Sequence, residues 1–229
     1  MQTEYLTFIV KFKVAGRFAY LSHQETLTFW RRVLVRAQIP LAFSQGYNPH
    51  PYVSLPLPRS VGVSSDCELL CARVRDDGIV AQDACEAIVP LLPDGCVLRA
   101  VEAVPGKMVF YPVSATYQFT LAAYPDRCRL NQFETCKSQL RTAEPVMVRR
   151  HVKNSRMRSM NICPFIESFA QEGQIVWIRC AIRPEGTARV DELMDWLGLE
   201  PYDLDEPVRR CAVRWGSDTK HQQGEIDLL

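Results

Sequence analysis

The sequence predicts an α+β protein of two tandem ferredoxin-like domains, each with the element order β-α-β-β-α-β. Three observations predict it. The 229 residues are 47% hydrophobic and 23% charged, which is enough for two buried cores. Strand-like and helix-like patterns follow one another in the same order twice. A connector containing Pro and Gly, residues 106–114, separates a domain at 1–105 from one at 115–216, and a polar tail at 217–229 is expected to be flexible.

The first predicted domain starts with a half-buried strand, because residues 8–14 alternate between apolar and polar. Ser22 and Glu25 have capping-box spacing, which predicts a helix that begins there and ends near Ala37. A loop dense in turn formers occupies residues 44–51. The remaining elements are expected as strands at 39–43, 53–57, 68–74 and 96–104 and a helix at 79–89.

The second predicted domain repeats this order without an evident residue-level repeat. Residues 115–123 alternate as a strand, and residues 131–140 have helical spacing of apolar residues. Gly198 is expected to end a helix at 190–197. Further strands are expected at 146–152, 174–182 and 208–215, with a basic and poorly patterned stretch after the first of them.

Charge is distributed unevenly along a chain whose formal net charge is only +1. Residues 1–60 carry seven Lys or Arg against two acids, and residues 149–184 also carry seven against two. The segments after each of them are acidic. Two basic segments in a nearly neutral chain predict one basic surface assembled from both.

Several classes of protein are excluded by what the sequence lacks. It has no apolar run of the length of a membrane span and no signal-peptide pattern at its start, so we expect a cytoplasmic protein with no membrane partner. The nine cysteines are scattered and none has C-x-x-C spacing, which indicates buried thiols rather than a zinc site or a cluster. Phosphate-loop and dinucleotide motifs are absent, so no ATP or dinucleotide chemistry is expected. Together with the cysteine spacing, this predicts neither a metal nor a cofactor.

The most unusual segment is the loop Ser44–Pro51, with the sequence SQGYNPHP. Gly46 accepts a positive φ, and two prolines fix φ and remove two donors. The loop is therefore expected to hold Tyr47, Asn48 and His50 as a stiff polar and aromatic cluster. A rigid crossover between strands is the alternative. The expected helix start at Ser22-His23 presents free amides to an anion.

These segments resemble a bacterial family of unknown function, the radical-SAM-linked proteins. The resemblance covers nearly all of residues 5–75 and rests on Arg17, Ser22-His23, the basic helix Arg31 to Ala37, the loop Ser44 to Pro51, and Gly62, Ser65 and Glu68. Farther along, Arg149, Arg150 and Lys153 match a basic run of the family, but Asn161 to Pro164 stand where the family has an Asp-x-Arg-Pro patch. A role that depends on that Asp–Arg pair is therefore not expected here.

The family accompanies B12-binding radical SAM enzymes, fused to them or encoded nearby. The resemblance thus implies a radical SAM enzyme as partner, and this chain has no C-x-x-x-C-x-x-C cluster motif of its own. It resembles the accessory protein rather than the catalyst, and no catalytic residue is assigned.

We predict a non-catalytic protein that binds RNA or presents a substrate in tRNA or rRNA modification, with no DNA partner. The segment 147–158 has five Lys or Arg and no acid, which favours a phosphate track over a solvated strand edge. The candidate RNA- or partner-binding residues are Arg17, Ser22, His23, Arg31, Arg32, Ser44, Gln45, Tyr47, Asn48, His50, Arg149, Arg150 and Lys153. Two alternatives stay open: a metal-independent endoribonuclease of the type that processes CRISPR repeats, using His23, His50 and Tyr47 as acid and base, and a pure protein–protein adaptor.

Overall fold

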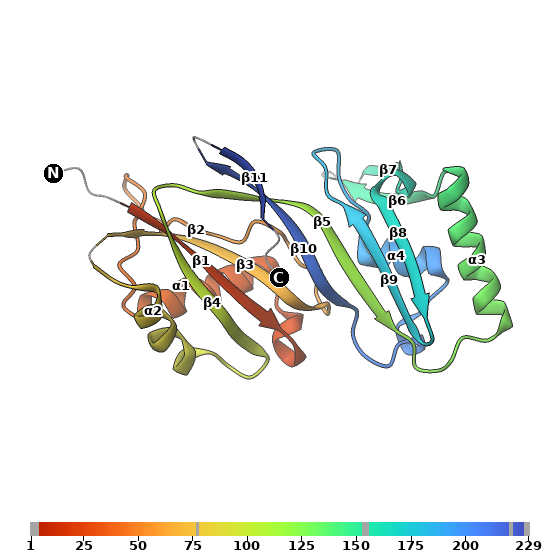
Figure 1. Cartoon of the computed structure of the whole chain (residues 1–229), viewed down its shortest axis with the longest axis horizontal. Helices are drawn as coiled ribbons and strands as arrows, with labels where there is room; N and C mark the ends of the chain where they lie inside the picture. The colour runs from red at the N-terminus through yellow and green to blue at the C-terminus, as the bar shows by residue number, and fades with distance from the viewer. Residues whose placement is uncertain (1–4, 77, 153–155, 220–221, 227–229) are drawn as a thin grey trace. The chain divides into compact units, whose positions relative to one another are not determined.

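The computed structural model describes residues 5–76, 78–152, 156–219 and 222–226 as a mixed α+β fold (Figure 1). The chain divides into two compact units. Unit 1 contains residues 1–112 and 214–229, and unit 2 contains residues 113–213. Strands β5 (Val109–Thr120) and β10 (Arg209–Thr219) each contribute to both units, so the connector predicted at 106–114 becomes a strand from Val109 onward.

Unit 1 has three long strands, β1 (Tyr5–Val14), β3 (Ser64–Arg75) and β4 (Cys96–Pro105), with β1 between the other two. The short strand β2 (Val53–Ser54) pairs with β3, and β10 is the neighbour of β3. All the pairs of β1 and β2 are antiparallel.

Two helices of unit 1, α1 (His23–Arg36) and α2 (Ala81–Ile88), pack against these strands to form one core. Phe8 of β1 and Ala72 of β3, which are opposite each other in the sheet, both belong to this core. Trp30 is fully buried and contacts the Phe12 ring at 4.6 Å between centroids, which fixes α1 on β1. Residues 39–43, predicted as a strand, make only isolated bridges at Leu41 and Phe43, because Pro40 and the loop that follows interrupt the ladder.

Unit 2 has the strand order β10-β5-β9-β8, with β8 at Ile166–Glu172 and β9 at Ile175–Ala181. Helix α3 (Arg127–Thr142) and helix α4 (Val190–Leu197) meet at Phe169, whose ring lies 5.9 Å from that of Phe133 and 6.1 Å from that of Trp196. Helix α3 starts earlier than predicted because Asp126 caps it, accepting from the Arg129 amide at 2.8 Å.

The basic stretch of unit 2 is a hairpin, in which β6 (Met147–Val152) pairs antiparallel with β7 (Arg156–Asn161). The sequence predicted only its first strand. Strand β8 was also missed, because the apolar residues of its sequence IESFAQE, at 166, 169 and 170, do not alternate with polar ones. In unit 1, residues 222–226 of the predicted flexible tail form β11 (Gln222–Ile226), which pairs with β10.

Candidate functional site

The loop Ser44–Pro51 is closed at its base by contacts between its two ends. Phe43 and Pro51 form a β-bridge, and the Ser44 amide donates to the His50 carbonyl at 2.9 Å. The His50 amide donates in turn to the Ser44 hydroxyl, also at 2.9 Å. Gly46 has φ +134°, a conformation that favours glycine. The base of the loop is therefore fixed by hydrogen bonds, and Ser44 has a structural part in it.

The tip of this loop is presented to solvent. The Tyr47 side chain is 101% exposed, and Gln45, Asn48 and His50 are exposed as well. None of these four side chains makes a hydrogen bond, ion pair or ring contact with a described residue. Intramolecular contacts thus do not account for the residue types at the tip.

The start of α1 is occupied by the chain's own carboxylate. The Ser22 hydroxyl accepts from the Glu25 amide at 3.3 Å and donates to the Glu25 carboxylate at 2.7 Å, and the Ser22 amide donates to the same carboxylate at 2.8 Å. These contacts hold the pKa of Glu25 below its ordinary value. The predicted capping box is confirmed, but a second anion would be repelled by Glu25, so Ser22 acts as a structural cap. His23 is half-buried beside it.

The segment from Arg59 to Glu68 is also structural. Buried Arg59 donates to the Ala19 carbonyl at 2.6 Å and to the Val63 carbonyl at 2.7 Å, and the Gly62 amide donates to the Ala19 carbonyl at 3.0 Å. Ser65 and Glu68 are 1% and 5% exposed. This segment ties the chain before α1 to the start of β3.

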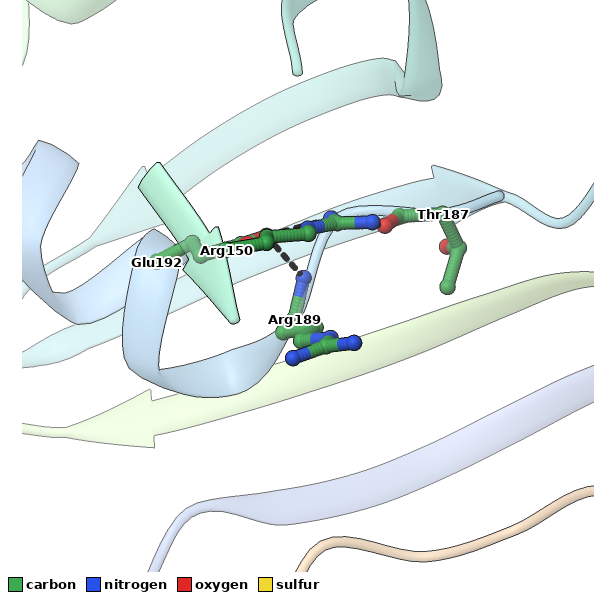
Figure 2. A network of polar contacts seen from close by, with 4 residues as sticks. All are labelled: Arg150, Thr187, Arg189 and Glu192. Carbon is green, nitrogen blue, oxygen red and sulfur yellow. Dashed lines mark hydrogen bonds and ion pairs between the residues drawn. The ribbon is translucent and has the colours of Figure 1, made fainter. Parts of the chain in front are cut away.

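In the basic hairpin, Arg150 is bound by protein acceptors (Figure 2). Its Nε donates to Glu192 Oε1 at 2.5 Å, and its Nη2 donates to Glu192 Oε2 at 2.6 Å and to the Thr187 carbonyl at 2.5 Å. The Arg189 amide donates to the same carboxylate at 2.8 Å. The assignment of Arg150 as a phosphate ligand is corrected: it neutralises a buried carboxylate of α4, a partner 42 positions away in the sequence.

The other predicted cations differ from Arg150. Arg17, Arg32 and Arg149 are exposed and make no ion pair with a described residue. Lys153 lies outside the described residues. Arg31 and Arg32 belong to unit 1 and Arg149 to unit 2, and their expected common surface stays a prediction.

Arg31 instead lines a cavity of about 500 Å³ within unit 1, together with Pro51 at the end of the loop. The cavity is also lined by Arg73 and Lys107, which were not predicted as site residues from the sequence. Arg73 had a detectable pattern, since it interrupts the apolar run of β3 between Ala72 and Val74. No sequence pattern singles out Lys107, because a lysine after a glycine between two strands is an ordinary surface residue.

Four buried thiols are poor nucleophiles. Burial raises the pKa of Cys71, Cys96 and Cys180 to about 12 and that of Cys136 to about 11. Within the described ranges, no group of three or more His, Cys, Asp or Glu side chains is placed to hold a metal ion.

A family model agrees with most of this chain. The model described as an uncharacterized protein conserved in bacteria (DUF2344) matches residues 7–190. The chain belongs to this family. The DUF2344 match includes the exposed loop, the cavity residue Arg31 and the basic hairpin. No curated protein matches the chain.

Among solved structures, the chain is similar to part of a Cbf5-Nop10-Gar1 complex known from its crystal structure. The TM-score is 0.42 at 12% sequence identity, and the match covers 90% of this DUF2344 chain and 48% of the other chain. The match therefore spans about half the length of that chain. In the described part of the chain, none of the helices combines the length and apolar character of a membrane span.

Proposed function

We propose that this protein is a cytoplasmic, non-catalytic accessory protein that binds RNA and presents it to a radical SAM enzyme. One observation carries the proposal: the loop tip at Gln45–His50 exposes an aromatic ring, an amide and an imidazole that make no hydrogen bond, ion pair or ring contact with a described residue. Several other motif residues of unit 1, such as Ser22 and Gly62, serve its own structure. The tip, together with the exposed Arg17 and Arg32, is thus the part of the motif left for a partner.

The charge around unit 1 favours a polyanion as that partner. Arg17 and Arg32 are exposed without an ion pair to a described residue, and the cavity beside the loop has cations and no carboxylate in its wall. Cations of this kind attract a phosphate backbone, and an exposed tyrosine offers a face on which a base can stack. Arg149 and Arg158 of the hairpin add exposed cations on unit 2.

The choice of a radical SAM enzyme as partner rests on the resemblance stated above. The chain lacks the cluster motif of such enzymes, so it is proposed to act beside one. An asparagine amide and an imidazole on the loop suit hydrogen bonding to a base edge, since each offers both a donor and an acceptor.

We also propose that both units are variants of the ferredoxin-like arrangement. Its support in unit 1 is the order β1-α1-β2-β3-α2-β4, with β1 between β3 and β4 and β2 on β3. In unit 2 the corresponding elements are β5, α3, β8, β9, α4 and β10, with the β6–β7 hairpin inserted after α3. Sheets of this kind commonly carry single-stranded RNA on a face.

The test is a filter-binding titration with total bacterial RNA, followed by a gel of the bound RNA. Binding that weakens with salt, without cleavage, is expected. Tyr47→Ala should weaken binding by about 1–3 kcal/mol, the usual value of one stacked base. The matched control is Tyr202→Ala, which removes an 80% exposed tyrosine of unit 2 and should change nothing.

Two results would contradict the proposal. Cleavage of the RNA that is lost in His50→Ala would indicate an endoribonuclease. Absence of binding at low salt by a folded protein would indicate a protein–protein adaptor.

A further inference from the structure

Unit 1 contains a cavity that the proposed RNA-binding loop does not explain. Its volume is about 500 Å³, which is within the usual range for sites of small organic ligands. Its wall is built by α1, β1, β2 with the residues on either side of it, β3, the turn between β4 and β5, and the first residues of β5. Loop-tip residues Tyr47, Asn48 and His50 are not part of it.

The cavity is cationic. Arg31, Arg73 and Lys107 line it, and the wall contains no Asp or Glu. None of these three side chains has a hydrogen bond or ion pair to a described residue. The Arg31 Nε is buried and has no acceptor in the described chain. A buried donor of a charged group without an acceptor is unfavourable, and three like charges around one space repel each other, so the site is built for an anion.

The structure positions the Arg73 guanidinium and the backbone at Arg31 and Lys107. Arg31 follows the fully buried Trp30, which fixes its position on α1. The Arg73 guanidinium lies over the Tyr52 ring, 4.5 Å from its centroid. The turn that carries Lys107 is tied to β1, because the Thr7 hydroxyl donates to the Gly106 carbonyl at 2.7 Å and accepts from the Met108 amide at 3.2 Å.

The cavity also has aromatic walls. Tyr52 and Tyr111 line it, and both are partly exposed. One side of the Tyr111 ring is set by the backbone of β10: a Cβ at Gly216 would lie 2.3 Å from that ring. Because no side chain fits between them, Gly216 allows the Tyr111 ring to lie against the strand. Such a fixed ring can stack on a planar group.

We propose that this cavity binds a nucleotide, with its phosphate on Arg31, Arg73 and Lys107 and its base against Tyr111. Inorganic phosphate alone would leave most of the space and both rings unused. The same chemistry is offered by a free nucleoside monophosphate and by one nucleotide of an RNA strand. The proposal goes beyond RNA binding by the loop and does not depend on it.

The first test is calorimetric titration of the whole protein with AMP, GMP, CMP and UMP, and with adenosine and inorganic phosphate as partial ligands. At least one nucleoside monophosphate should bind, and the two partial ligands should bind at least about tenfold more weakly, since each lacks one half of the contacts. Absence of binding by all four nucleotides at millimolar concentration overturns the proposal.

Variants locate the site. Arg31→Gln and Lys107→Gln should each weaken the nucleotide by about 10- to 100-fold, the usual effect of losing a charge-assisted hydrogen bond. Arg36→Gln is the matched control: it removes an exposed arginine of the same helix that is not in the cavity wall. Lys107 is exposed in a turn, so its variant stays informative if Arg31→Gln does not fold. Equal binding by Lys107→Gln and the parent protein overturns the assignment.

A competition experiment separates the two sources and the two proposals. If single-stranded RNA displaces the nucleotide, the cavity receives one nucleotide of the strand. If it does not, the ligand is a free nucleotide. Tyr47→Ala should weaken RNA binding and leave nucleotide affinity unchanged. If the loop does not bind RNA, only the first result changes; if the cavity does not bind a nucleotide, the titration with nucleotides shows it.

Discussion

Two adjacent arginines of strand β6 have opposite surroundings. Arg150 is partly buried and pairs with Glu192 through two donors, whereas Arg149 is exposed and has no ion pair in the described chain. Alternation along a strand explains the difference, since neighbouring side chains point to opposite faces. The sequence shows two equivalent basic residues, and only the position of Glu192 on α4 separates them.

We predict that Arg150→Ala lowers the free energy of unfolding by about 3–5 kcal/mol, because it leaves the Glu192 carboxylate buried without its cation. Arg149→Ala should leave stability unchanged within about 0.5 kcal/mol. It should instead reduce the salt dependence of RNA binding by about one unit. Urea unfolding of both variants checks the first two values. If Arg150→Ala left the free energy of unfolding unchanged, the Arg150–Glu192 pair would not stabilise unit 2.

At the scale of elements, the sequence predicted best those features that depend on contacts between residues close together in the chain. The capping box of α1 depends on residues three positions apart and was predicted from sequence. The loop was predicted as an exposed turn-rich segment for the same reason. The cavity was not predicted, because Arg31, Arg73 and Lys107 come from elements far apart in the sequence. Strand β8 was missed because its apolar residues, at 166, 169 and 170, do not alternate with polar ones.

The cap of α1 gives a second prediction. Ser22→Ala should lower stability by about 1 kcal/mol at neutral pH, the usual value of an N-cap. The Ser22 hydroxyl and amide lower the pKa of Glu25 in the folded state, so their contribution is present above the ordinary value of 4.5 and is lost as pH falls through the lowered folded pKa. The difference between variant and parent should therefore shrink in acid. Thermal unfolding at pH 7 and pH 3 measures it, and a difference that grows in acid would be contrary to this account.

Strand β10 gives a third prediction. Gly216→Ala should lower stability by about 1–3 kcal/mol and weaken nucleotide binding, because the new Cβ would overlap the Tyr111 ring. Gly216→Ala combined with Tyr111→Ala should recover stability but not nucleotide binding. Recovery of neither property would indicate that Gly216 serves the strand rather than the ring.

At the scale of the whole molecule, the α+β class predicted from sequence is confirmed, while the limits of the units do not follow from the sequence. The chain returns to unit 1 after residue 213, and β5 and β10 contribute to both units. Such a return depends on strand pairings that are distant in sequence, so no composition change marks it. The cysteines allow a test at this scale, because buried thiols occur in both units and their reactivity shows whether each core is closed.

We expect the nine thiols to differ widely in reactivity. Cys128 is exposed and should react with a thiol reagent at pH 8 in the native protein. Cys71 and Cys96 of unit 1 and Cys136 and Cys180 of unit 2 are buried, with raised pKa values, and should react only on unfolding. Mass spectrometry of the labelled peptides identifies them. Rapid native labelling of Cys96 or Cys180 would mean that the corresponding core is open.

The central claim is that unit 1 contacts RNA through its exposed loop. Ultraviolet crosslinking of bacterial RNA containing 4-thiouridine, followed by mass spectrometry of the crosslinked peptides, tests it most directly. We predict crosslinks at Tyr47 and its neighbours in the peptide that carries residues 44–51, and their loss in Tyr47→Ala. Crosslinks confined to other segments, with none in this loop, would contradict the account.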